Sequence, residues 1–161
     1  AMKKWGKICP VFDRIRPVQT FGMPKTAPPK KPGRKKEPKT VRLEFDFSGI
    51  PAGSLMFVAT PDIIEDYIRR IPPGETRSLI SMRREIARRR KCDATCPVST
   101  AIFVRMVAES ALKDIEAGKP VSDVTPFWRV ISSADKIAKR LPGDPAWIDT
   151  QRALESSREG S

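Results

Sequence analysis

LISMRREIARRRKCDATCPVSTAIFVRMVAESALKDIEAG, residues 79–118, predicts two helices joined by a short turn. Ser78 is placed as an N-cap, and the first helix is expected to run from Leu79 to about Lys91. A turn over residues 92–95 follows. Pro97 then starts a second helix and Gly118 lies just past its end, the usual positions of these residue types. The inward face of the first helix would consist of Leu79, Met82 and Ile86. This pattern is typical of a helix-turn-helix.

Three elements are expected before this pair. VRLEFDF at 41–47 alternates apolar with charged residues, which predicts a strand, and SLMFVA at 54–59 is a short apolar run typical of a buried strand. Thr60 and Pro61 then begin a helix, as cap and first helical residue. Its buried face would comprise Ile64, Tyr67, Ile68 and Ile71.

After the pair, FWRVI at 127–131 is expected to form a strand, residues 132–135 a turn, and KIAKRL at 136–141 a returning strand. A strand pair in this place would be a wing. A last short helix follows Asp144 and Pro145. The predicted fold class is therefore mainly α with a small β component, a winged helix-turn-helix domain over residues 41–161.

Residues 1–40 are expected to form a basic, Pro-rich arm that is extended or disordered. MPKTAPPKKPGRKKEPKT at 23–40 contains five Pro and seven Lys or Arg, which leaves little apolar surface to bury. Lys35 and Lys36 in this arm are expected to contact phosphate. Such contacts add sequence-independent affinity by releasing counterions.

The charge of the chain indicates a polyanionic partner. Its 161 residues include 31 Lys or Arg, 19 Asp or Glu and no His, which gives a net charge of +12. Lys and Arg gather in residues 25–42 and 69–91, so the charge is localised. Since no apolar run approaches the roughly 18 residues of a membrane span, we expect nucleic acid and no membrane.

The expected nucleic-acid contacts lie mainly on the helix pair. Arg84, Arg88 and Lys91 are spaced i, i+4, i+7 and are expected to face phosphate. In the first turn of the second helix, Ser99 and Thr100 are expected to reach bases or phosphates, with helix capping as the alternative for Ser99. The other expected phosphate contacts are Arg77, Arg83, Arg89 and, beside the wing, Arg129.

The three cysteines, Cys9, Cys92 and Cys96, predict neither a disulfide framework nor, without His, a metal site. We expect no metal and no cofactor. The expected location is a reducing cytoplasm, nucleoid-associated or equivalent.

Three segments in order resemble the DNA-binding domain of O6-alkylguanine-DNA alkyltransferases and their alkyltransferase-like relatives. IPPGETRS at 71–78 is similar to the family's Ile-Pro-x-Gly-Glu segment, and the helix pair follows it. Pro126-Phe127-Trp128-Arg129-Val130 is similar to the Pro-Cys-His-Arg-Val active-site motif. The resemblance covers roughly residues 55–143 and implies DNA binding and a role in recognising damaged or alkylated DNA.

The departures from that motif predict a protein without enzyme activity. Phe127 stands where the family has its alkyl-accepting Cys, and Trp128 where it has the activating His. A phenyl ring accepts no alkyl group, and an indole is not a general base. As neighbours on a strand, Phe127 and Trp128 would point to opposite faces, so only one would line a base pocket. By the resemblance, Leu79 and Pro97 replace the residues that support base flipping.

The sequence therefore predicts a non-enzymatic protein that binds nucleic acid, with duplex DNA first among the ligands. Two alternatives stay open. One is an RNA-binding or ribosome-associated protein, because basic Pro-rich arms on small domains are common in that class. The other is a protein-interaction module on the same fold. Protein partners are possible, and the sequence does not indicate which.

Overall fold

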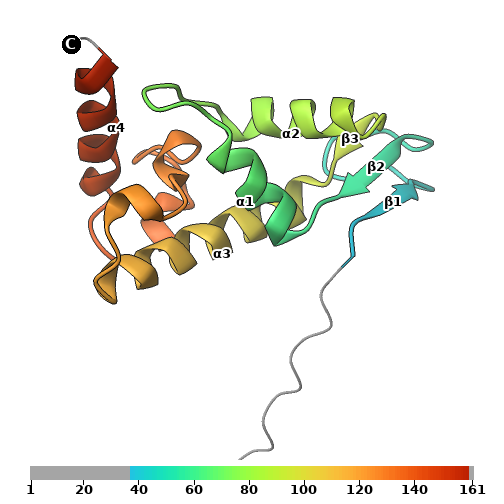
Figure 1. The fold of residues 1–161 in the computed structure, drawn as a ribbon. Helices are drawn as coiled ribbons and strands as arrows, with labels where there is room; N and C mark the ends of the chain where they lie inside the picture. Colours follow the sequence, from blue (N-terminus) through green and yellow to red (C-terminus); the bar gives the residue numbers. More distant parts are fainter. Residues whose placement is uncertain (1–36, 160–161) are drawn as a thin grey trace, which may run out of the picture. The chain divides into compact units, whose positions relative to one another are not determined.

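The computed structural model describes residues 37–159, which belong to one unit, residues 36–161. Helices dominate these residues and a small sheet accompanies them, as predicted (Figure 1). The elements are β1 (Lys39–Arg42), β2 (Leu55–Val58), α1 (Pro61–Arg69), α2 (Leu79–Arg89), β3 (Ala94–Thr95), α3 (Pro97–Glu116) and α4 (Ala146–Glu159). Short 3-10 turns occupy Val121–Asp123, Phe127–Arg129 and Ala138–Arg140. Most of the predicted arm, with Lys35 and Lys36, lies outside the described residues.

The sheet has the order β1-β2-β3, with β1 antiparallel and β3 parallel to β2. The buried strand predicted at 54–59 is confirmed as β2, whose Met56 and Phe57 are buried. The strand predicted at 41–47 is wrong beyond Arg42. From there the chain bends away, because the Asp46 carboxylate accepts a hydrogen bond from the Ala52 N–H at 2.8 Å and closes a loop.

The core lies between the helices and the chain that follows α3. As predicted, Thr60 caps α1 by accepting from the Ile63 N–H, and Ile64, Tyr67, Ile68 and Ile71 are buried. α1 packs on α3, whose Val104 and Ala108 have no exposed surface. In Figure 1, α1 lies between α2 and α3, and α4 stands at the far end of α3.

The helix pair is confirmed, with a longer connection than predicted. Ser78 caps α2 by accepting from the Ser81 N–H at 3.1 Å. α2 ends at Arg89 because Lys91 takes a left-handed conformation, with φ of 53°, and closes a Schellman motif. In this motif the Cys92 N–H donates to the Ala87 carbonyl at 3.0 Å. The connection also contains β3 and is held to the sheet by a hydrogen bond from the Asp93 N–H to the Leu55 carbonyl at 2.9 Å.

The predicted wing is wrong for residues 37–159. Residues 127–131 form a 3-10 turn, in which the Val130 and Ile131 N–H groups both donate to the Phe127 carbonyl. These backbone groups are therefore not available to a strand ladder. The turn also buries the two neighbouring side chains Phe127 and Trp128, which are 1% and 3% exposed, on the same side of the chain. A strand would have placed them on opposite faces.

Candidate nucleic-acid interface

The exposed side of α2 carries three cations without an acidic partner. Arg84, Arg88 and Lys91 are exposed, and none of the ion pairs within residues 37–159 involves them. We call these three residues the basic face. Lys91 lies two residues beyond the end of α2 in a left-handed conformation, so it does not continue the helical stripe of Arg84 and Arg88 that the sequence predicts. Unpaired cations on one surface are what a phosphate backbone requires.

The other cations of α2 are partly engaged inside the domain. Arg89 lies 3.9 Å from Glu85 and stacks over the Tyr67 ring, and Arg90 lies over the Phe57 ring. Arg83 forms no ion pair within the described residues but is only half-exposed. Its side chain lines a groove opposite residues 48–50.

Arg77, which the sequence predicts as a phosphate contact, is paired with acidic residues of the domain, Glu85 among them. The Arg77 guanidinium pairs with Glu75 at 2.6 Å and with Glu85 at 3.9 Å. Glu85 also accepts a hydrogen bond from the Tyr67 hydroxyl at 2.9 Å. Burial and this hydrogen bond raise the pKa of Tyr67 to about 12. Arg77 is therefore already balanced by two carboxylates.

Arg129 is held inside the fold, and its nucleic-acid contact stays a prediction. Its side chain is 12% exposed and forms a bidentate ion pair with Glu155 of α4, with the shortest N–O distance 2.7 Å. It also donates to the Ile71 carbonyl. Desolvation works against ionisation of Glu155, but the hydrogen bonds from Arg129 and the Gly74 N–H outweigh it and lower the pKa of this carboxyl. Each of the three guanidinium nitrogens of Arg129 therefore donates a hydrogen bond within the domain.

The first turn of α3 does not present its polar groups outward. Thr100 is 1% exposed and donates to the Cys96 carbonyl at 2.7 Å, so its hydroxyl is engaged inside the helix and its contact with a base stays a prediction. Ser99 is half-buried and donates to the same carbonyl at 3.5 Å. Ser and Thr hydroxyls in helices often bond back to the backbone in this manner. The exposed apolar residues of α3 are Val98, Ile102 and Met106.

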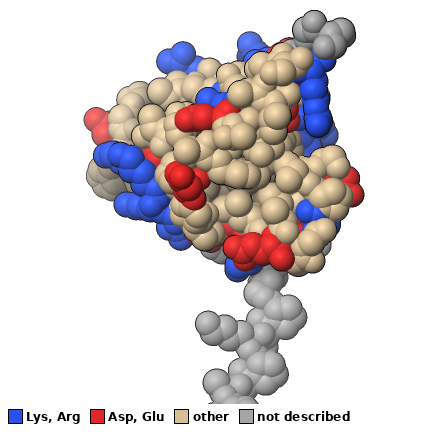
Figure 2. All heavy atoms as spheres, turned by 90° about the vertical axis from the view of Figure 1, so that its left-hand side faces the viewer, with Lys and Arg blue, Asp and Glu red and all other residues tan. Residues whose placement is uncertain are grey.

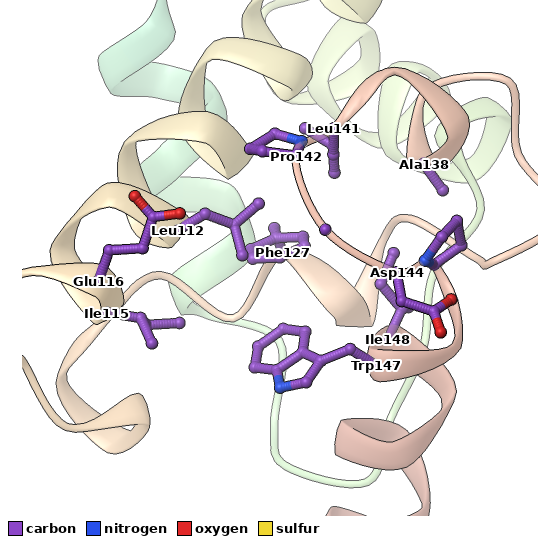
Figure 3. Close-up of a pocket in the computed structure, with 12 residues that line it drawn as sticks. Leu112, Ile115, Glu116, Phe127, Ala138, Leu141, Pro142, Asp144, Trp147 and Ile148 are labelled. Atoms are coloured by element: carbon purple, nitrogen blue, oxygen red, sulfur yellow. The ribbon is translucent and has the colours of Figure 1, made fainter.

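The segment that resembles the active-site motif lies in the core. Pro126, Phe127, Trp128 and Val130 are all buried. Phe127 stacks with Trp147 at a centroid distance of 5.9 Å, and Trp128 meets both rings edge to face. Phe127 also borders a largely apolar cavity of about 290 Å³. Figure 3 shows Phe127 between Leu112 and Ile115 of α3 and Trp147 of α4.

No protein-family model, curated protein or solved structure matches this chain. The likeness to the alkyltransferases therefore stays a resemblance of short segments.

The cavity and the basic face belong to different parts of the domain. The cavity lies at the C-terminal end of α3, and the basic face lies toward the C-terminal end of α2, on opposite sides in Figure 1. Two carboxylates, Glu116 and Asp144, also line the cavity and would repel phosphate. Figure 2 shows the end of the domain that carries α4. Uncharged residues and a few acidic side chains occupy the middle of this face, and Lys and Arg lie mainly along its rim.

Sequence reasoning missed the anchoring role of α4. Arg152 donates to the Trp128 carbonyl at 2.6 Å and to the Ile131 carbonyl at 2.9 Å, and Glu155 holds Arg129. The i, i+3 spacing of Arg152 and Glu155 predicts that both lie on one face of the helix. Nothing in the sequence indicates which segment that face meets. In the described residues no cluster of His, Cys, Asp and Glu is arranged for a metal ion, and no helix is long and apolar enough to cross a membrane.

Proposed function

We propose that this chain binds nucleic acid, with duplex DNA as the first candidate, through phosphate contacts from the basic face of α2, and that it catalyses no reaction. The observation that carries the proposal is that Arg84, Arg88 and Lys91 are exposed together without an acidic partner among the described residues. Cations that neutralise phosphates displace condensed counterions, which supplies affinity that does not depend on base sequence.

Stabilisation of the helix does not account for Arg84. Cations in the last turn of a helix interact favourably with its dipole, and the effect falls off within that turn. Arg88 and Arg89 lie in the last turn of α2, so the dipole favours both, and Arg89 and the cap residue Arg90 also stack on rings of the domain. Arg84 lies at the middle of the helix, where the dipole gives it little.

The geometry favours backbone binding over base flipping. Two of the expected contacts are engaged within the domain, because Thr100 is buried and Arg129 is paired to Glu155. Phe127 has neither a nucleophile nor a proton to exchange, and its cavity lies away from the basic face. Recognition of alkylated DNA therefore rests on the resemblance alone.

A protein partner is a second candidate, because α3 exposes an apolar stripe. Val98, Ile102 and Met106 follow one another at i, i+4 and i+8 and are 49%, 47% and 45% exposed. Apolar residues at this spacing on one helix face are typical of helix-in-groove recognition.

A charge-matched pair of variants tests the proposal. The first carries Arg84→Gln, Arg88→Gln and Lys91→Gln; the control carries Lys136→Gln, Lys139→Gln and Arg140→Gln, which are exposed and form no ion pair within residues 37–159. Each of the two variants removes three positive charges. Fluorescence anisotropy with labelled duplex DNA, at several salt concentrations, measures the affinity of both variants and of the parent.

The first variant is expected to bind duplex DNA more weakly than the parent. Its plot of log binding constant against log salt concentration should be less steep by about 2.7, at 0.9 per lost phosphate contact. The control should keep nearly the parental slope. Equal losses in the two variants would mean that net charge, and not the basic face, binds DNA. Structured RNA in the same titration separates the RNA-binding alternative, and no binding to either polymer would favour the protein partner.

A further inference from the structure

The loop between β1 and β2 holds an aromatic ring in solvent. Phe45 is 79% exposed, the highest value among the large exposed hydrophobic residues of the described chain. The loop around it is nevertheless closed by backbone hydrogen bonds. Phe47 and Ile50 exchange two of these, at 2.9 and 2.8 Å, across the Ser48–Gly49 turn, and the Gly53 N–H donates to the Leu43 carbonyl at 2.7 Å. The loop is therefore held by its backbone hydrogen bonds, and the exposed Phe45 ring contributes little buried surface to it.

The same loop borders α2. A groove of about 250 Å³ is lined by residues 48–50 of the loop, by Ile80, Arg83 and Arg84 of α2, and by residues 93–95. The last set includes the carboxylate of Asp93, which accepts a hydrogen bond from the Leu55 N–H at 2.7 Å. Neither arginine takes part in an ion pair within residues 37–159. Phe45 does not line this groove itself but lies three residues before Ser48, which does. An exposed ring and unpaired guanidinium groups within a few residues of one groove are the groups that bind single-stranded nucleic acid, with bases stacked on aromatics and phosphates held by cations.

We propose that Phe45 stacks on an unpaired base while Arg83 and Arg84 hold the neighbouring phosphates. The ligand is then nucleic acid with an unstacked base, either a single strand or a gap in a duplex. This rests on the proposed function and adds the class of nucleic acid. Glu44 and Asp46 flank the ring and would repel phosphate, but carboxylates accept hydrogen bonds from exocyclic amino groups of bases. The charges thus direct bases to the loop and phosphates to α2.

The test uses the full chain and the variants Phe45→Ala, Phe45→Leu and Phe45→Trp. Leu154→Ala is the control, since Leu154 is also an exposed hydrophobic, 51%, but lies on α4. The probes are a labelled mixed-sequence single strand, the same strand in an intact duplex, and that duplex with a short gap. Vesicles of phosphatidylserine and phosphatidylcholine form a separate arm, because exposed aromatics beside arginines also suit an anionic membrane surface.

Phe45→Ala is expected to weaken binding to the single strand and the gapped duplex by roughly 5- to 100-fold, as loss of one base stack does. Intact duplex binding should stay within about twofold, since phosphate contacts alone carry it. Phe45→Trp should keep the parental affinity for the single strand and the gapped duplex, and Phe45→Leu should lose it, because stacking needs a flat π-face. Leu154→Ala should behave as the parent on every probe.

Equal effects of Phe45→Ala on all three nucleic acids, or none, would overturn the stacking role, and so would Phe45-dependent binding to vesicles without binding to oligonucleotides. If the parent binds no nucleic acid, the proposed function fails as well. If the parent binds duplex through the basic face and Phe45→Ala changes nothing, only this inference fails.

Discussion

The ion pair between Arg129 and Glu155 makes a sharp prediction about the segment that resembles an active site. In the structure the Arg129 guanidinium joins three parts of the domain: the 3-10 turn at 127–129, α4 through Glu155, and the Ile71 carbonyl before α2. The perturbations are Arg129→Gln, Glu155→Gln and the double variant. If the pair serves the fold, both single variants lose stability, and neither loses affinity for duplex DNA under conditions in which it stays folded.

The expected size follows from the burial of the pair. The two side chains are 12% and 14% exposed, so removing either partner leaves a charge that water barely reaches. Breaking a buried pair costs about 3–5 kcal/mol, and the slight exposure here favours the lower end, about 3 kcal/mol. In a domain of this size that lowers Tm by about 10 °C. The double variant leaves no uncompensated charge and should lose less than the sum of the single variants, with a coupling of about 2 kcal/mol.

Urea denaturation followed by circular dichroism measures these free energies, and anisotropy with duplex DNA measures affinity below the unfolding transition. Lys119→Gln is the control, because its pair with Asp114 has side chains 48% and 46% exposed and should contribute less than about 1 kcal/mol. If Arg129→Gln keeps parental stability and loses tenfold or more in affinity, Arg129 contacts the ligand and the assignment to the fold is refuted.

Three further predictions follow from the described contacts. A hydrogen bond from Thr125 lowers the pKa of Glu65, and hydrogen bonds from Arg129 and the Gly74 N–H lower that of Glu155, both from 4.5. The stability contributed by such groups is present above their unfolded pKa and is lost as pH falls through the folded value, so Tm should drop below about pH 4.5. Glu155→Gln should flatten this drop, and parallel curves would contradict it. Thr100→Val should cost about 1 kcal/mol without changing DNA affinity; the reverse outcome would restore its predicted role as a contact. Incubation with DNA containing O6-alkylguanine should add no alkyl mass by intact mass spectrometry, and a stoichiometric adduct on any Cys would overturn the non-enzymatic assignment.

Local signals in the sequence predict the helices well. Ser78, Thr60 and Pro97 mark helix starts that the structure confirms, because caps and first-turn prolines act within a few residues. The apolar spacing of α1 also gives its buried face correctly. These features depend on neighbours in the chain and need no knowledge of the tertiary fold.

Features that depend on distant residues were not predictable. The apolar run at 127–131 suits a strand by composition, but contact with Trp147, 20 positions away from Phe127, holds it as a 3-10 turn. Arg129 looks like a surface cation until Glu155 on α4 is placed beside it. In the candidate site, the helical spacing predicts that Arg84 and Arg88 lie opposite the buried face of α2. Both are exposed as predicted, because no distant acidic residue pairs with them in the described residues.

Lys91 makes the end of α2 a point of local frustration. Its φ of 53° is a conformation that glycine adopts freely and that costs a side-chain-bearing residue about 1 kcal/mol. Lys91→Gly should therefore raise the free energy of unfolding by about that amount while removing one cation from the basic face. Folding alone favours glycine here, whereas the proposed function needs the lysine, so the proposal places stability and affinity in conflict at this residue. Under that proposal the backbone dihedral angle is linked to the ligand, because the side chain that costs stability is the one that would meet phosphate.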